Sequence, residues 1–453
     1  MESRIKTIHH DLTSGNRSCF DMVQEKLSLL NANMYHTVHL LLEESALKQA
    51  KQVDEKVRSG KPVGQLEGVP FGITDVLLLQ NTLTTGGTAF LKNYHAPYTA
   101  TAIQKLMDAG AIPLVKEGCS AVNVAKGHTA FSIGSDIGGC IRQPAGYHQL
   151  YGMKPTYGRV SRYGMMANMS SIDCIGTLAS SLEDIRILLN TMSGKDPNDP
   201  TTHSTSIVSE NVFDDGYLKK EIVVGYFKNF IANDFLDEAI KNGFQKMLDT
   251  LAAKGIKIIP LDFFDVNVLV SVFYVLAMAE EASNLARFDG TLYGERAKSS
   301  SREDYTRTRA ENFSKETINR IIGGNLAVSR SNYEDIYLKA RRLRNEMIDC
   351  FNTCFKKVDV ILSPVTASGI AGIDAGITGI IGGTTGIIGG TNTCGDRACP
   401  VSTISDAFTA GFSLGGLPTL AVPFFTPTGI QISSNKNQED MILNFAHVLK
   451  EIQ

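Results

Sequence analysis

The sequence predicts an α/β fold, in which helices cover a mainly parallel or mixed β-sheet. Short apolar segments that favour strands alternate with longer amphipathic segments of helical period. In addition, 43% of the 453 residues are hydrophobic, which is enough to build a large core. A βαβ unit is the plainest example, because a strand at 69–73, a helix at 99–109 and a strand at 111–115 follow one another.

The remaining helices and strands are predicted from the same two kinds of segment, amphipathic and short apolar. Apolar residues at helical spacing predict helices over 33–59, 180–193, 233–254, 273–288, 333–357 and 438–452. Short apolar segments predict strands at 221–227, 256–261, 358–362 and 419–423, the last of which we expect to be the final strand. Ser180 or Ser181 is a favourable N-cap for the helix that follows. A seven-residue Gly/Ile repeat at 378–390 disfavours a helix and predicts a surface loop, with a lid or a partner-binding loop as the alternative.

Composition and charge narrow the classes of function. The formal net charge is −3 and no long Lys/Arg run occurs, so we expect no direct binding to nucleic acid. The sequence has no run of 18 apolar residues and no N-terminal signal segment, which predicts no membrane span and a cytoplasmic location. The mitochondrial matrix is the expected location if the source is eukaryotic. Eight scattered cysteines, without a C-x-x-C pair or a His partner, predict reduced thiols, no metal site and no cofactor.

One cysteine stands out because of its neighbours. Cys140 lies in the segment GSDIGGCIRQPAGY at 134–147, directly after Gly138 and Gly139. Two glycines allow a sharp turn in which consecutive backbone N–H groups point to one side. Such a nest can stabilise the oxyanion that forms when a nucleophile attacks a carbonyl. The N–H groups from Ile137 to Cys140 are therefore a candidate oxyanion hole, with Cys140 as the candidate nucleophile.

Longer motifs make this interpretation specific. They are DIGGCIRQP at 136–144, GMKPTYGRVSRYG at 152–164, GVPFG at 68–72, SNLARFDG at 283–290 and FSLGGLPTLAVP at 412–423. Together they resemble the amidase signature family over nearly the whole chain, and within it most of all the A subunits of glutamyl-tRNA(Gln) amidotransferases. The resemblance implies an α/β fold with a mixed central sheet of about eleven strands wrapped by helices. It also implies amidase-type chemistry at a carbon–nitrogen bond.

The resemblance implies a single domain over 1–453. Its parts are an N-terminal helical region at 1–60, a signature core at 61–200, a helical and α/β insertion at 201–355, and C-terminal strands with a helix at 356–453. A Gly-rich loop at 368–400 belongs to the last part.

The family pattern includes a Ser nucleophile, a bridging Ser and a Lys base, and this chain departs from all three. Cys140 stands at the nucleophile position, and Thr74, in GITD at 72–75, stands at the Lys position. The Gly/Ser-rich segment with the bridging Ser is absent, because the chain runs from LVKEGCS at 114–120 almost directly to Gly134. A threonine hydroxyl cannot accept a proton near neutral pH, so the family's base is missing.

Two other residues are candidates for that base. Counting back from Cys140 without a gap places Lys116 at the bridging position, where it could replace the lost Lys if the deletion lies upstream. If the deletion lies downstream, Lys116 is only the structural Lys that precedes the missing segment. His128 is the other candidate, although a loop histidine is more often solvated.

Two positions match the substrate-binding pattern of the amidotransferase A subunits. Arg320 and Asp406 stand where those proteins hold the α-carboxylate and the α-amine of glutamine. The resemblance therefore implies a small amide or amino-acid-like substrate, and the partner that it implies is a B-type amidotransferase subunit.

Two interpretations of the altered site stay open. In the first, Cys140 is a working nucleophile, because a thiol has an ordinary pKa of about 8.5 and needs less help than a serine hydroxyl. In the second, the chain is an inactive relative that serves for ligand binding or as a scaffold in a larger complex. The glycine pair, Asp136 and Arg142 match the family pattern and favour the first interpretation slightly.

Overall fold

The computed structural model describes residues 2–32, 38–118, 120–214, 221–297, 303–368 and 401–452. Its centre is one mixed sheet of eleven strands in the order β1-β3-β2-β4-β6-β5-β10-β11-β9-β7-β8. The predicted α/β class and the sheet of about eleven strands are thereby confirmed. The strands are β1 (Val38–Leu41), β2 (Pro70–Thr74), β3 (Ile112–Glu117), β4 (Phe131–Asp136), β5 (Tyr151–Lys154), β6 (Cys174–Ala179), β7 (Val223–Phe227), β8 (Lys257–Leu261), β9 (Val360–Pro364), β10 (Thr419–Val422) and β11 (Ile430–Ser434).

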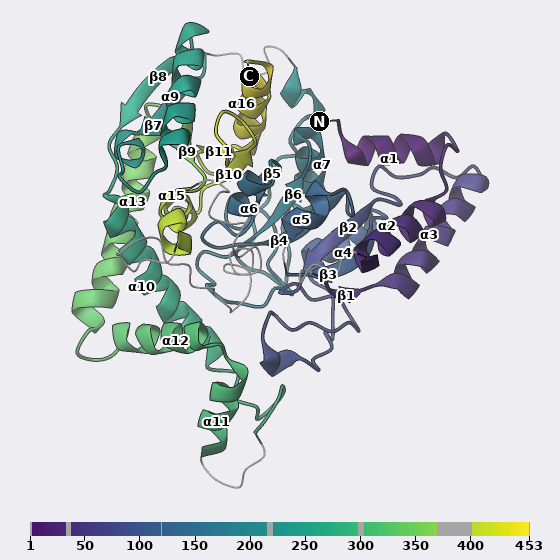
Figure 1. Cartoon of the computed structure of the whole chain (residues 1–453), viewed down its shortest axis with the longest axis horizontal. Helices are drawn as coiled ribbons and strands as arrows, with labels where there is room; N and C mark the ends of the chain where they lie inside the picture. Colours follow the sequence, from purple (N-terminus) through teal and green to yellow (C-terminus); the bar gives the residue numbers. More distant parts are fainter. Residues whose placement is uncertain are drawn as a thin grey trace.

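Helices cover both faces of this sheet (Figure 1). They are α1 (Arg4–Thr13), α2 (Cys19–Ala32), α3 (Glu43–Arg58), α4 (Thr101–Asp108), α5 (Ser120–Ala125), α6 (Arg142–Tyr147), α7 (Leu182–Met192), α8 (Lys228–Ile231), α9 (Glu238–Ala253), α10 (Val266–Leu285), α11 (Glu303–Asn312), α12 (Lys315–Ala327), α13 (Lys339–Cys354), α15 (Val401–Leu414) and α16 (Glu439–Ile452). Among the described residues there are also short 3-10 turns at Ala89–Leu91 and Glu210–Phe213 and a π-helical turn at Tyr333–Leu338.

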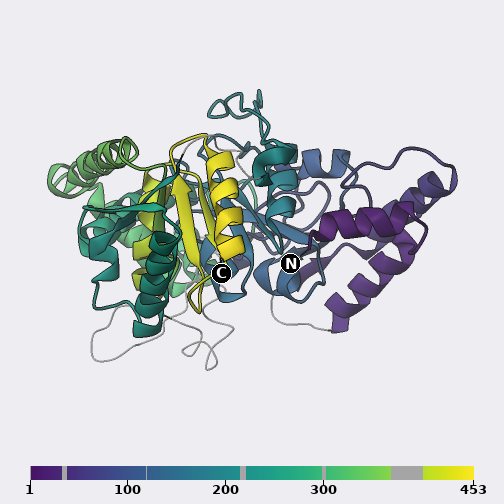
Figure 2. The same cartoon turned by 90° about the horizontal axis from the view of Figure 1, so that it is seen from above.

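Two helical layers bury opposite faces of the strands. Leu362 and Ile361 are neighbours in β9 and pack into different apolar clusters, as the alternation of side chains along a strand requires. The apolar cluster that contains Leu362 also contains side chains from helices α4, α7, α9 and α16. The cluster that contains Ile361 also contains side chains from α10, α13 and α15. Figure 2 shows the purple N-terminal helices at one end of the molecule and the yellow C-terminal strands and helix nearer its middle.

Strand direction decides where the site forms. β2 is parallel to both β3 and β4, and Ile73 of β2 lies beside Ile133 of β4. The carboxyl ends of these strands therefore meet at one edge of the sheet. β4 and β6 pair antiparallel as far as Asp136 and Cys174. The segment that leaves β4 after Asp136 is the one that carries Cys140.

Several predicted elements need correction. The helix predicted at 33–59 was wrong over 38–42, because β1 pairs antiparallel with β3 there and α3 begins only at Glu43, while 33–37 lie outside the described residues. The strand near 419–423 is β10 and not the last, because β11 follows it at Ile430–Ser434. The helix expected from 273 begins at Val266, and the one expected from 233 begins at Glu238. Ser181 is confirmed as an N-cap, since its side chain accepts the N–H of Asp184.

Helix α10 is long and apolar enough, by length and composition alone, to cross a membrane. Half of that stretch is buried inside the protein, and the helix packs against α12, α13 and α15. This packing is that of a core helix. The Gly/Ile repeat at 378–390 lies outside the described residues.

Candidate active site

The loop from Ile137 to Cys140 leaves the carboxyl end of β4 and enters α6. Gly139 has a φ of 135°, a backbone conformation that side chains rarely allow. A Cβ there would lie 2.7 Å from both Gln143 Nε2 and Thr409 Oγ1, and a Cβ on Gly138 would lie 2.9 Å from the ring of Phe273. The glycine pair is therefore required by close packing on both sides, as the sequence predicts for a tight turn.

The backbone of this loop offers hydrogen-bond donors. Within the described part of the chain, the N–H groups of Ile137, Gly138 and Gly139 donate to no protein acceptor. The carbonyl of Gly138 is fixed from the other side, because it accepts the hydroxyl of Thr409. Cys140 follows at once and is buried, with 3% of its surface exposed. This arrangement suits a nucleophile with an adjacent oxyanion hole.

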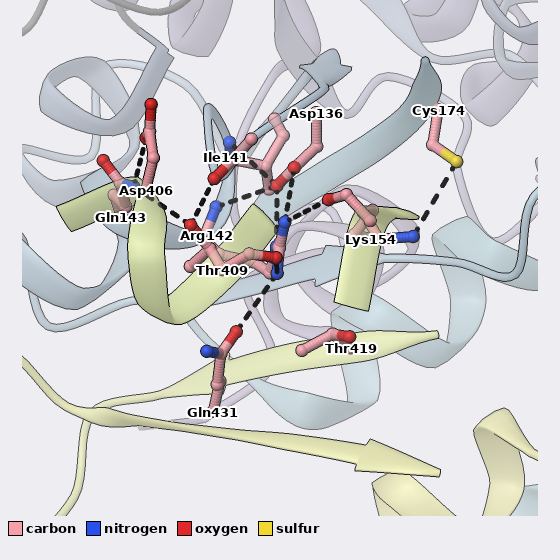
Figure 3. A network of polar contacts seen from close by, with 12 residues as sticks. Asp136, Ile141, Arg142, Gln143, Lys154, Cys174, Asp406, Thr409, Thr419 and Gln431 are labelled. Atoms are coloured by element: carbon pink, nitrogen blue, oxygen red, sulfur yellow. Dashed lines mark hydrogen bonds and ion pairs between the residues drawn. The ribbon is translucent and has the colours of Figure 1, made fainter. Parts of the chain in front are cut away.

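A fully buried ion pair holds the loop in place (Figure 3). Arg142 donates to both oxygens of Asp136, at 3.0 Å and 2.8 Å. The remaining N–H groups of the guanidinium reach Thr409 O at 3.0 Å, Gln431 Oε1 at 3.1 Å and Ser413 Oγ at 2.8 Å. Burial by itself would raise the pKa of Asp136, but Arg142 holds that pKa below its ordinary value. The network ties β4, α15 and β11 together beneath Cys140.

Thr74 occupies the end of β2, beside β4. Its side chain is buried, and its Oγ1 has no hydrogen-bond partner among the described residues. A Cβ on Gly134 would lie 2.6 Å from this oxygen and 3.1 Å from Ile141 Cδ1. Thr74 therefore lies on the face of the sheet that carries α6, against the strand that leads to Cys140.

Lys116 is fixed by other contacts. Its Nζ donates to Leu77 O at 2.7 Å and Thr84 Oγ1 at 2.9 Å, and it pairs with Asp75 Oδ1 at 3.2 Å. Burial lowers the pKa of Lys116, and the charge of Asp75 opposes that effect. Three acceptors thus surround the ammonium group, which fits the structural role that the sequence left open for this lysine.

A buried acid that sequence reasoning missed lies between these residues. Glu117 pairs across the strands with Thr74, and its carboxylate accepts hydrogen bonds from Ser132 at 2.7 Å and from Asn123. A Cβ on Gly72 would collide with this carboxylate, so the glycine makes room for it. Burial raises the pKa of Glu117 to about 7. His128 Nδ1 lies 3.4 Å from Asn123 Oδ1, which places the second candidate base in the same polar network.

Glu117 should make folding stability depend on pH. The folded protein keeps the proton of Glu117 up to about pH 7, whereas an unfolded chain releases it near 4.5. The folded state binds more protons in this window, so the free energy of unfolding should fall by about 3 kcal/mol as pH rises through it. Glu117→Gln should reduce that fall in urea unfolding measured from pH 4.5 to 8. An unchanged slope would contradict the assignment, since every other titrating group contributes equally in both proteins.

The candidate substrate residues lie on the other side of the nucleophile loop. Asp406 accepts from Gln143 Nε2 at 2.9 Å and from the hydroxyl of Tyr274 at 2.8 Å. A Cβ on Gly138 would lie 3.6 Å from its carboxyl carbon, so Asp406 adjoins the loop. Burial raises the pKa of Asp406 to about 6, against the effect of these two donors. Tyr274 has no sequence signal of its own, because it is one aromatic residue in an apolar helix.

Arg320 lies on α12, which packs against α10. Its guanidinium pairs with Glu316 at 2.7 Å and with Glu281 at 3.7 Å. Burial would lower the pKa of Arg320, but these two carboxylates raise it above its ordinary value. Tyr274, which donates to Asp406, and Glu281, which pairs with Arg320, both belong to α10, so the two predicted substrate residues contact the same helix. The fold thus places Asp406 beside the loop that carries Cys140, while the ammonium of Lys116 faces Asp75.

Comparison with known proteins gives the family. A family model described as Amidase matches residues 23–118 and 117–443, and these segments meet where the sequence lacks the Gly/Ser-rich stretch. The curated A subunit of the glutamyl-tRNA(Gln) amidotransferase from Trichodesmium erythraeum is 32% identical over 492 aligned positions, which cover 99% of this chain and 97% of that protein.

Solved structures show the same fold. The A subunit of the glutamyl-tRNA(Gln) amidotransferase from Thermotoga maritima superposes with a TM-score of 0.65 at 25% identity, over 85% of this chain and 83% of that one. A second structure is a chain of a vestigial protein complex that reveals the evolutionary origins of an s-triazine catabolic enzyme. It superposes with a TM-score of 0.81 at 20% identity, over 100% of this chain and 98% of that one. From the family model and the curated relatives, the chain belongs to the amidase signature family of carbon–nitrogen hydrolases and amidotransferases, as a relative of the amidotransferase A subunits.

Proposed function

We propose that this protein transfers the acyl group of a glutamine-like amide through Cys140. The observation that carries the proposal is the loop before Cys140, where three consecutive N–H groups lack a protein acceptor among the described residues. Donors that are already in place at the position of the developing oxyanion stabilise the transition state more than the ground state.

The reaction would run in two steps. The sulfur of Cys140 attacks the carbonyl carbon of the amide, and the thiol proton goes to the nitrogen. The carbon–nitrogen bond then breaks, which leaves a thioester on Cys140 and a free amine or ammonia. Water or an amine attacks the thioester carbonyl, and Cys140 regains its proton.

Three side chains would hold an amino-acid-like substrate. Arg320 would bind a carboxylate with its planar guanidinium, and Asp406 would bind an ammonium group. The Tyr274 hydroxyl supports this assignment, since its bond to Asp406 Oδ2 fixes the carboxylate beside the nucleophile loop.

Arg320 gives a binding prediction. Arg320→Ala should weaken glutamine binding by about 1.5–3 kcal/mol, because a charge-assisted contact is lost, and Arg320→Lys should weaken it less. Isothermal titration calorimetry measures both, with Arg307→Lys as the control, since Arg307 pairs with Glu311 on the surface. Absence of glutamine binding by the native chain would remove this substrate assignment.

Release of ammonia tests the proposed reaction. The native protein should release ammonia from glutamine or another primary amide, and Cys140→Ala should abolish that release while leaving glutamine affinity unchanged. Equal release by both proteins would remove Cys140 from the mechanism.

A scaffolding function is the second candidate, and one observation favours it. Lys116 is fixed by Leu77, Thr84 and Asp75, and Thr74 supplies no base, so the site lacks the proton acceptor of the family pattern. In that case the protein would bind glutamine and turn over no amide.

The cellular setting of the reaction is likewise part of the proposal. The curated relatives are named as A subunits, and the partner that this supports for the chain is a B-type amidotransferase subunit. The exposed side chains of Ile322 and Leu326 on α12 offer an apolar surface for such a contact. We place the protein in the cytoplasm, without contact to membrane or nucleic acid.

A further inference from the structure

One face of helix α15 lies against the nucleophile loop. Asp406 and Thr409 are three residues apart, so they lie on the same side of this helix. A Cβ on Gly138 would lie 3.6 Å from the carboxyl carbon of Asp406, and a Cβ on Gly139 would lie 2.7 Å from Thr409 Oγ1. Arg142 donates to the carbonyl of Thr409 at 3.0 Å, which anchors the helix at this point. The proposed ammonium ligand and the loop therefore share one packed surface.

Gln143 connects the two side chains of α15 (Figure 3). Its Nε2 donates to Asp406 Oδ1 at 2.9 Å and to Thr409 Oγ1 at 3.1 Å, so both N–H groups of the amide are used. All three side chains are buried. Burial raises the pKa of Asp406 to about 6, so the group is a carboxylate at neutral pH and can only accept hydrogen bonds. The amide must therefore present its nitrogen to this carboxylate.

The hydroxyl of Thr409 has one proton to donate. Its oxygen accepts an N–H of Gln143, and its proton goes to the carbonyl of Gly138. The hydrogen bonds thus have one direction, from Gln143 through Thr409 to the loop. The carboxylate of Asp406 sets this direction, and the hydroxyl of Tyr274 holds that carboxylate from another side at 2.8 Å.

The carbonyl of Gly138 determines where the next N–H group points. A peptide unit is planar and trans, so the C=O of Gly138 and the N–H of Gly139 point in opposite directions. Because Thr409 holds the carbonyl, the N–H of Gly139 points away from α15. Glycine on both sides of this peptide, with a φ of 135° at Gly139, leaves little steric resistance to its rotation. The hydroxyl of Thr409 supplies the restraint that the loop itself lacks.

We infer that Thr409 is a positioning residue for the oxyanion hole, and that Gln143 couples it to the substrate residue Asp406. The hydroxyl of Thr409 locks the peptide between Gly138 and Gly139 so that the N–H of Gly139 faces the developing oxyanion, and Gln143 orients that hydroxyl. This inference rests on the proposed acyl transfer. A substrate ammonium at Asp406 and the reacting carbonyl oxygen would then be held by one connected set of hydrogen bonds.

Removal of one hydroxyl tests the lock. Thr409→Val keeps the shape of the side chain and loses the bond to Gly138, whereas Thr409→Ser keeps the hydroxyl. Thr426→Val is the matched control, because Thr426 is also buried and its hydroxyl donates to another glycine carbonyl, that of Gly429, at 2.6 Å. The measurements are kcat and KM for ammonia release from glutamine, with the unfolding midpoint of each variant.

Thr409→Val should lower kcat about 10- to 100-fold and change KM less than threefold, because a misplaced donor weakens binding of the transition state while Arg320 and Asp406 still hold the substrate. Thr409→Ser and Thr426→Val should stay within threefold of the native protein. Gln143→Met should lower kcat and also raise KM, since it removes a donor from Asp406 as well. An unchanged kcat in Thr409→Val or Gln143→Met, or an equal loss in Thr426→Val, would overturn the inference.

Two thiol reagents separate this inference from the proposed function. If the native protein releases no ammonia, amide turnover fails as its function, and labelling of Cys140 decides the lock. A chloroketone analogue of glutamine places a carbonyl oxygen at the oxyanion hole, whereas methyl methanethiosulfonate has no carbonyl group. Thr409→Val should slow labelling by the chloroketone about tenfold or more and leave labelling by the other reagent unchanged. Equal effects on both reagents, or no reaction of Cys140 with the chloroketone, would overturn the inference.

Discussion

Replacing Asp136 by Asn should lower the free energy of unfolding by about 3–5 kcal/mol. Asp136 and Arg142 are both fully buried, and the substitution leaves the guanidinium charge without its counter-ion. The loss should be large because Arg142 also connects the β4 end to Thr409, Ser413 and Gln431, so it cannot move toward solvent without breaking these bonds. Denaturant unfolding followed by circular dichroism measures the change.

The exposed pair of Arg307 and Glu311 is the control for that experiment. Both side chains are at least half exposed, so Arg307→Gln should cost less than about 1 kcal/mol. If Asp136→Asn unfolds at the same denaturant concentration as Arg307→Gln, the buried pair does not hold the loop as described.

Cys140→Ser should lower amide turnover by orders of magnitude, although serine is the residue that the family pattern has there. A serine hydroxyl is far less acidic than a thiol and needs both a base and a relay. Thr74 supplies no base, and Lys116 Nζ lies against Leu77, Thr84 and Asp75. The measurement is ammonia release from glutamine, together with glutamine affinity and the unfolding midpoint, which this nearly isosteric change should leave intact.

A second variant separates the explanations. Thr74→Lys added to Cys140→Ser should recover little activity, because the bridging serine segment is still absent. Equal background activity in Cys140→Ser and the native protein would favour the scaffolding function. A gain of activity in Cys140→Ser would mean that another residue, Lys116 first among them, acts as the base.

Much of this site was predictable because its signals are local. The turn at Gly138 and Gly139 follows from residue types next to each other, and the structure adds the close neighbours Phe273 and Thr409 that make glycine necessary. Arg320 and Asp406 came from the resemblance alone, and their positions depend on how α12 and α15 each pack against α10, which no local pattern specifies.

The parts that sequence reasoning missed depend on contacts between distant segments. The sequence of β4 is a mixture of polar and apolar residues, although the strand is buried. Its polar residues Ser132 and Asp136 have their partners on other elements, namely Glu117 and Arg142. Glu117 looks like an ordinary charged residue at the end of a strand until β2 supplies the space over Gly72.

Covalent labelling is the most direct test of the central claim that Cys140 is the nucleophile. The protein is incubated at pH 7 with a chloroketone analogue of glutamine and its cysteine peptides are read by mass spectrometry. Cys19 and Cys354 are internal controls, because burial raises the pKa of each thiol to about 12. We expect Cys140 to be labelled faster than any other cysteine, and we expect added glutamine to slow that labelling. An unmodified Cys140, or slow and uniform labelling of all cysteines that glutamine does not affect, would contradict it.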